Sequence, residues 1–135
     1  MNRSGLVTES KLLAFAAVVE LGTGLVLAVA PAFAVGLLLG SRLTSDGFPV
    51  CRVAGIALMA LGLACWLGPK AGGGSPAFRG MLAYSALVAL YLAHLGLFRQ
   101  VRGRLLWPAV ALHAVVALLL LWTWRRRPRA AAANS

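Results

Sequence analysis

Four long apolar segments divide this chain, and they restrict its fold more than any other feature. They cover residues 12–39, 50–67, 78–97 and 105–124, and charged residues, glycines and prolines separate them. A helix needs about 20 apolar residues to cross the hydrocarbon core of a bilayer. Only 12% of the 135 residues are charged, whereas soluble domains keep about a quarter of their residues charged. The sequence therefore predicts an all-α, multi-pass membrane protein, a bundle of four transmembrane helices forming one domain over residues 1–135.

The first apolar segment is too long for a single span. As one helix its residues would measure about 42 Å, against a hydrocarbon core of about 30 Å. Pro31 interrupts the segment, and proline favours the start of a helix over its interior. We therefore expect spans over residues 11–30, 50–67, 78–97 and 105–124, and a short interfacial helix over residues 31–40. Ala32-Phe33-Ala34 resembles a signal-peptide cleavage site, but the preceding apolar run is longer than the usual 7 to 15 residues and contains Glu20.

The basic residues indicate how the chain is oriented in the membrane. The net charge is +10, and most of the 13 Lys and Arg residues flank the apolar segments, so we expect contacts with lipid and none with nucleic acid. With four spans, eight of these residues fall on the side of the two termini and five on the other side, which predicts cytoplasmic termini. Residues 125–135 are expected to form a basic, disordered tail. The arginines expected to contact anionic head groups are Arg125, Arg126, Arg127 and Arg129.

Each expected span carries one ionisable residue at its middle or toward its outer end: Glu20, Arg52, His94 and His113. Ionisable residues inside a membrane are costly, and they usually face the bundle interior and pair with one another. We therefore expect these four side chains to share an inner polar pocket. On the third span a stripe at three- and four-residue spacing is expected to face inward with His94; it comprises Tyr84, Leu87, Tyr91, His94 and Phe98. Residues that could line the pocket are Thr23, Tyr84, Tyr91 and Trp107.

This polar set contains no recognisable catalytic or metal-binding pattern. One Glu and two His do not form a motif such as HExxH, so neither an enzyme nor a metal site is predicted. Cys51 and Cys65 are expected to be small apolar fillers. Four readings stay open: a structural cluster that holds the helices in register, a small-ligand, quinone or partner site, a b-type haem between His94 and His113, and a proton-coupled transporter. We favour an accessory or small-ligand-binding subunit without a cofactor, with a larger membrane partner or as a homo-oligomer.

Two resemblances add to this reading. The stretches ELGTGLVLAVAP, RVAGIALMALGLACW, MLAYSALVALYLAHLG and LLWPAVALHAVVALLL look similar to a group of small four-span bacterial inner-membrane proteins of unknown function. This resemblance implies a location in the bacterial inner membrane and no particular activity. The shorter stretch ELGTGL resembles the first-helix region of small multidrug-resistance exporters, which carry one membrane-embedded Glu there. It implies only that Glu20 could bind a proton or a cation.

Overall fold

The structure, a computed structural model, describes residues 3–68 and 75–126. Its helices are α1 (Arg3–Val29), α2 (Pro31–Leu39), α3 (Gly47–Leu67), α4 (Pro76–Phe98) and α5 (Leu106–Arg125). The described ranges contain no strand. Four of the helices, α1, α3, α4 and α5, are long and apolar enough to cross a membrane. The predicted fold class, an all-α bundle with four helices able to span a membrane, is confirmed.

The helix ends differ from the expected ones in two places. Helix α1 begins at Arg3, well before residue 11, although its apolar part, Ser10–Val29, agrees with the expected first span. Helix α5 continues to Arg125, the first residue of the expected tail, and the rest of that tail from residue 127 lies outside the described residues. Every helix after α1 has a proline in its first turn, where backbone N–H groups have no partner within the helix. These prolines are Pro31, Pro49, Pro76 and Pro108.

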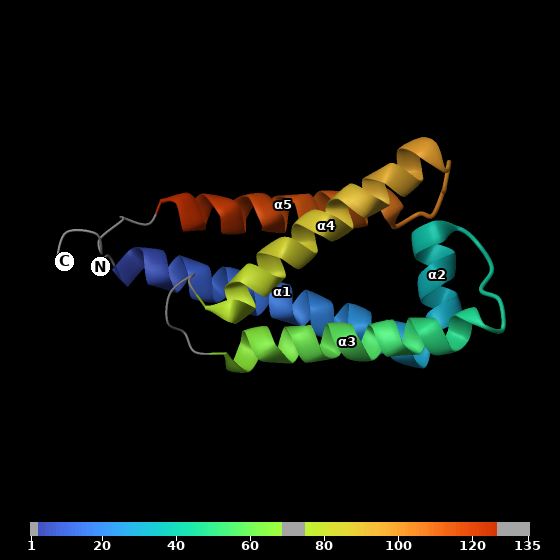
Figure 1. Ribbon diagram of the computed structural model, residues 1–135, viewed down its shortest axis with the longest axis horizontal. Helices are drawn as coiled ribbons and strands as arrows, with labels where there is room; N and C mark the ends of the chain where they lie inside the picture. Colours follow the sequence, from blue (N-terminus) through green and yellow to red (C-terminus); the bar gives the residue numbers. More distant parts are fainter. Residues whose placement is uncertain (1–2, 69–74, 127–135) are drawn as a thin grey trace.

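The four long helices alternate in direction, and α1 packs most closely on α3 (Figure 1). Glycines allow this close approach. A Cβ added to Gly24 of α1 would lie 2.6 Å from the carbonyl oxygen of Gly55 in α3, and one added to Gly62 would lie 2.9 Å from that of Ala17. Lipid tails are as apolar as the helices, so association in a bilayer depends on such close van der Waals packing between small residues.

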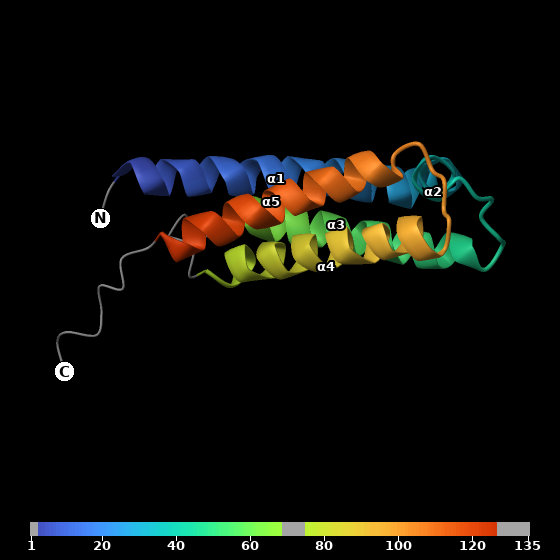
Figure 2. The ribbon, with the colours of Figure 1, turned by 90° about the horizontal axis from the view of Figure 1, so that it is seen from above.

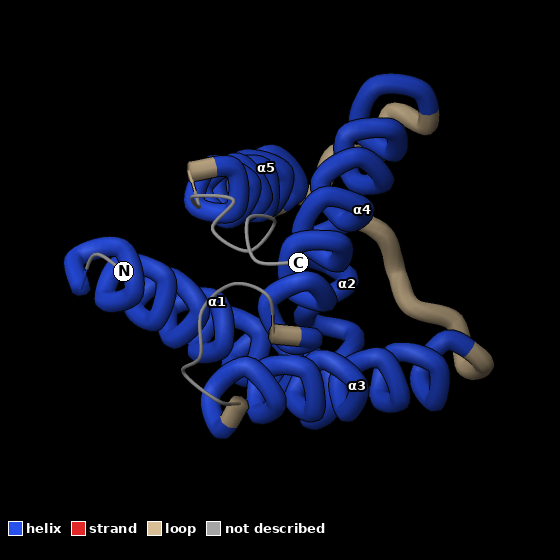
Figure 3. The backbone as a smooth tube through the Cα atoms, turned by 60° about the vertical axis from the view of Figure 1, so that its left-hand side comes forward, coloured by secondary structure: helices blue, strands red, loops and turns tan. Residues whose placement is uncertain are grey.

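Helix α4 packs on α5, and this second pair meets the α1–α3 pair mainly toward the end where α1 begins and α5 ends (Figures 1 and 2). Toward the opposite end α4 diverges from α3 (Figure 3). The buried cluster that joins the two pairs takes residues from all four long helices: Ala16, Ala17, Cys65, Phe78, Met81, Val116 and Leu120. The bundle is therefore two helix pairs joined by one apolar core.

Helix α2 connects the two pairs at the opposite end. Its last residue, Leu39, is followed by the capping residue Gly40, whose φ of 67° is a left-handed conformation that glycine adopts readily. The backbone N–H of Leu105, just before α5, donates a hydrogen bond to the carbonyl oxygen of Leu37 (2.9 Å). Gly103 lies against the backbone of Leu38, with no room for a side chain. Helix α2 thus fixes the chain entering α5, and its location at a membrane interface stays a prediction.

Candidate functional site

Glu20 is buried in the bundle, on the face of α1 that also buries Ala16, Ala17 and Gly24. Only 4% of its side chain is exposed. A carboxyl group in such surroundings requires polar partners, because a buried polar group without hydrogen bonds costs several kcal/mol, on the order of 2–7. The other residues of the site are those that approach this carboxyl group.

The closest partner of Glu20 is His113, which reaches it from α5. Its Nε2 lies 3.6 Å from Glu20 Oε1, and only 12% of the His113 side chain is exposed. The contact therefore joins the α1–α3 pair to the α4–α5 pair. It brings together two of the four ionisable residues that the sequence analysis placed in an inner polar pocket.

A second contact of His113 determines where its hydrogens lie. Its Nδ1 is 2.8 Å from the carbonyl oxygen of Ala109, one turn earlier in α5. A carbonyl oxygen can only accept, so Nδ1 must carry a hydrogen and donate it. In a neutral His113 the Nε2 lone pair would then face a carboxylate oxygen, which is repulsive. The contact becomes favourable when either Nε2 or Oε1 carries one additional proton. The pair is then a protonated His113 beside a carboxylate, or a neutral His113 beside a carboxylic acid, and in both cases it has no net charge.

Two further side chains complete the surroundings of the carboxyl group. The ring of Tyr84, in α4, meets the His113 ring edge to face, with centroids 5.8 Å apart and an interplanar angle of 64°. The Tyr84 side chain also interacts with Glu20. Cys65, in α3, lies within the electrostatic field of the same carboxyl group. All four long helices therefore contribute to the site.

The second carboxyl oxygen of Glu20 is the unusual feature of this site. Oε2 is buried and has no hydrogen-bond partner in the described part of the chain. Buried polar atoms are nearly always paired, and an unpaired one often marks a place for water, an ion or a ligand. The site therefore offers an acceptor that a hydrogen-bond donor could use.

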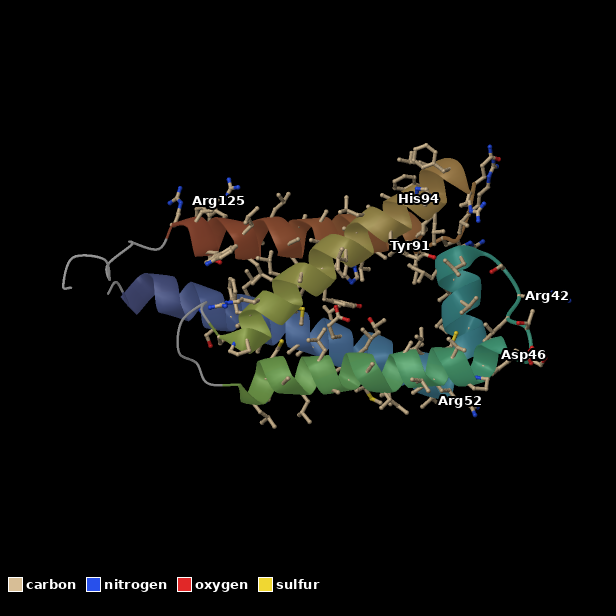
Figure 4. The ribbon with its side chains drawn as sticks, viewed as in Figure 1. Arg42, Asp46, Arg52, Tyr91, His94 and Arg125 are labelled. Atoms are coloured by element: carbon tan, nitrogen blue, oxygen red, sulfur yellow. The ribbon has the colours of Figure 1, made fainter. Side chains whose placement is uncertain are left out.

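Arg52 does not join the pair. It is exposed near the start of α3, toward the α2 end of the bundle, and its side chain points away from the bundle (Figure 4). The buried face of α3 is formed by Gly55, Gly62 and Cys65, which pack on the neighbouring helices. Arg52 lies beside this face, so the expectation that it shares an inner pocket with Glu20 is wrong.

His94 also lies elsewhere. It is exposed on the C-terminal half of α4, with its ring 5.0 Å from that of Phe98 (Figure 4). The expected inward stripe of α4 is wrong beyond Tyr84, since Leu87, Tyr91 and Phe98 are all more than 60% exposed. The face that α4 buries instead comprises Phe78, Met81, Ser85, Ala89 and Leu92.

The remaining residues proposed as pocket lining lie away from the pair. Thr23 is exposed on α1. Trp107 is half exposed, and its ring lies against the backbone near Gly96 of α4. Cys65, predicted to be a small apolar filler, is buried in the apolar core as expected, and it also lies near Glu20. No sequence signal distinguishes it, because its nearness to Glu20 follows only from how α3 packs on α1.

The described residues hold no group of three or more His, Cys, Asp or Glu side chains that could bind a metal ion. For a haem between His94 and His113, His113 would have to give up one of its two present contacts.

Comparison with known proteins assigns the chain to no family. The chain matches no protein-family model, and comparison with curated proteins and with solved structures found no match.

Proposed function

We propose that this protein is a small-ligand-binding or accessory subunit of the bacterial inner membrane, without enzymatic activity, in which Glu20 and His113 bind one proton inside the bilayer. The hydrogen bond from His113 Nδ1 to Ala109 is the observation that carries the proposal. It leaves Nε2 facing Glu20 Oε1, where one proton makes the contact favourable. The excess of Lys and Arg on the side of the termini supports an orientation with both termini in the cytoplasm.

The proton would regulate what Glu20 can bind. With the proton in place the pair is neutral, and Oε2 can accept a hydrogen bond from an uncharged N–H or O–H donor. If the proton leaves, the site carries a negative charge that favours a cation or further protonation. Protonation and ligand binding are therefore coupled at one carboxyl group.

Infrared difference spectroscopy of the purified protein tests the proton site. Spectra recorded at two pH values should contain a carboxyl signal that is absent in Glu20→Gln. In His113→Gln the same signal should move to another pH, because the partner that shares the proton is gone. Thr23→Val, an exposed change on α1, serves as the control and should leave the signal unchanged. Identical infrared difference spectra for Glu20→Gln and the unsubstituted protein would contradict the proposal.

Proton-coupled transport is the second candidate, and the arrangement of the two helix pairs favours it. Glu20 and His113 lie on opposite sides of the boundary between the α1–α3 and α4–α5 pairs. The two pairs pack on each other less extensively than the two helices of each pair do. A relative movement of the pairs would therefore change the site directly. Vesicles containing the protein should take up tetraphenylphosphonium when a pH gradient is imposed, and those containing Glu20→Gln should not. Equal uptake by both would exclude this transport activity for that cation.

A further inference from the structure

A groove of about 450 Å³ runs along the outer surface of α5, and Glu20 is not among the residues that line it. Its lining is four apolar side chains and one arginine: Leu118, Leu119, Leu121, Trp122 and Arg125. Leu118 and Trp122 are each about half exposed or more, so the groove opens outward from the bundle. A volume of this size falls within the range of small-molecule sites, about 300–1,000 Å³.

Positive charge gathers at one end of the groove only. Arg125 is exposed at the end of α5, and Figure 4 shows its side chain directed away from the bundle. The guanidinium carbon of the next residue, Arg126, lies 4.0 Å from the centroid of the Trp122 ring. This cation–π contact holds a second positive charge at the same end of the groove. Among residues 10–68 and 75–126, no acidic side chain forms an ion pair with either arginine.

The order of these side chains along α5 matches the order of groups in a phospholipid. Leu118 precedes Arg125 by seven residues, which is about 10 Å along a helix. Trp122 lies between them, and tryptophan is enriched at the level of the lipid head groups. An acyl chain against the leucines would place its phosphate beside the arginines, which bind phosphate oxygens through several N–H donors.

We propose that this groove binds one anionic phospholipid of the surrounding leaflet, with an acyl chain along Leu118 and Trp122 and the phosphate at Arg125 and Arg126. This site is independent of the proton at Glu20 and requires only that α5 spans the membrane. The two arginines supply charge complementarity, and they would select anionic over zwitterionic lipid. Association with a second copy of the chain through this face is the competing outcome.

Native mass spectrometry of the full-length protein in detergent, titrated with phosphatidylglycerol or phosphatidylcholine, tests the proposal. Phosphatidylglycerol should be retained more tightly, and Arg125→Gln should weaken its binding about fivefold. Arg52→Gln is the matched control, since it removes the same charge from an exposed arginine near the other end of the bundle. Arg52→Gln should weaken phosphatidylglycerol binding less than about twofold, because salt screens charges that lie far from the groove.

A second variant tests the apolar part of the groove. Leu118→Phe adds volume at an exposed position and should weaken phosphatidylglycerol binding while leaving the thermal stability of the protein unchanged. Equal retention of the two lipids, or equal effects of Arg125→Gln and Arg52→Gln, would overturn the proposal. It would also be overturned by a dimer that Leu118→Phe converts to a monomer, because a second copy would then occupy the groove.

Discussion

Glu20 Oε1 lies 3.6 Å from His113 Nε2, and this contact crosses the boundary between the two helix pairs of the bundle. Both side chains are almost fully buried, so neither can recover its polar interactions with water. The described residues offer Glu20 no other ion-pair partner. The stability of the whole bundle should therefore depend on this pair in a way that substitutions can measure.

Replacing Glu20 by Leu should destabilise the protein. The change leaves His113 Nε2 buried without its partner, and an unsatisfied buried group costs about 1–3 kcal/mol. Glu20→Gln, which can still form a hydrogen bond, should lie between Glu20→Leu and the unsubstituted protein. Thermal unfolding in detergent, followed by circular dichroism, provides the measurement.

A double replacement identifies the partner. Glu20→Leu combined with His113→Leu should recover part of the lost stability, because neither polar group is then left alone. Glu20→Leu combined with Arg52→Met should recover none, since Arg52 is exposed away from the site. A stabilising effect of Glu20→Leu alone would mean that Glu20 faces lipid, in contradiction to its burial here.

The four spans could be predicted from the sequence because length and apolar composition alone decide whether a helix can cross a bilayer. The burial of Glu20 also followed, since a carboxyl group is far more costly against lipid than inside a bundle. The position of a residue along its helix follows from counting residues, whereas its depth in the membrane stays a prediction.

Rotation of each helix about its axis could not be predicted in the same way. In a soluble protein the apolar stripe marks the buried face, but a membrane helix is apolar on both faces. The spacing of Tyr84, Tyr91 and His94 showed that they share one side of α4 without showing where that side points. Close packing decides instead, and α4 buries Ser85 and Ala89, small residues on a neighbouring face.

Cysteine labelling should establish the orientation. In a chain with Cys51 and Cys65 replaced by Ala, a cysteine at Thr44, exposed between α2 and α3, should react with a membrane-impermeant thiol reagent in intact cells. A cysteine at Gly73, which lies between α3 and α4 in the sequence, should react only after the cells are opened. The expectation follows from the excess of Lys and Arg on the side of the termini. The opposite pattern would reverse the orientation.

The purified protein should be colourless. In a bis-histidine haem site both ligands must offer a free ring nitrogen, whereas His113 uses Nδ1 for Ala109 and Nε2 for Glu20. We therefore expect no Soret band from haem-replete cells and none after haem is added. A stoichiometric Soret band that disappears in His94→Ala and in His113→Ala would establish the haem alternative instead.

Gly22 and Gly24 provide a matched test of helix packing within α1. A Cβ on Gly24 would lie 2.6 Å from the carbonyl oxygen of Gly55, so Gly24→Ala must push α1 and α3 apart. Overpacking of this kind costs about 1–3 kcal/mol. A Cβ on Gly22 meets nothing within 4 Å, so Gly22→Ala should leave the unfolding temperature unchanged or raise it slightly. Gly55→Ala, on the opposing face, should repeat the effect of Gly24→Ala. If Gly22→Ala and Gly24→Ala unfolded at the same temperature, α1 would not pack on α3 through Gly24, and the α1–α3 pair that positions Glu20 would need to be revised.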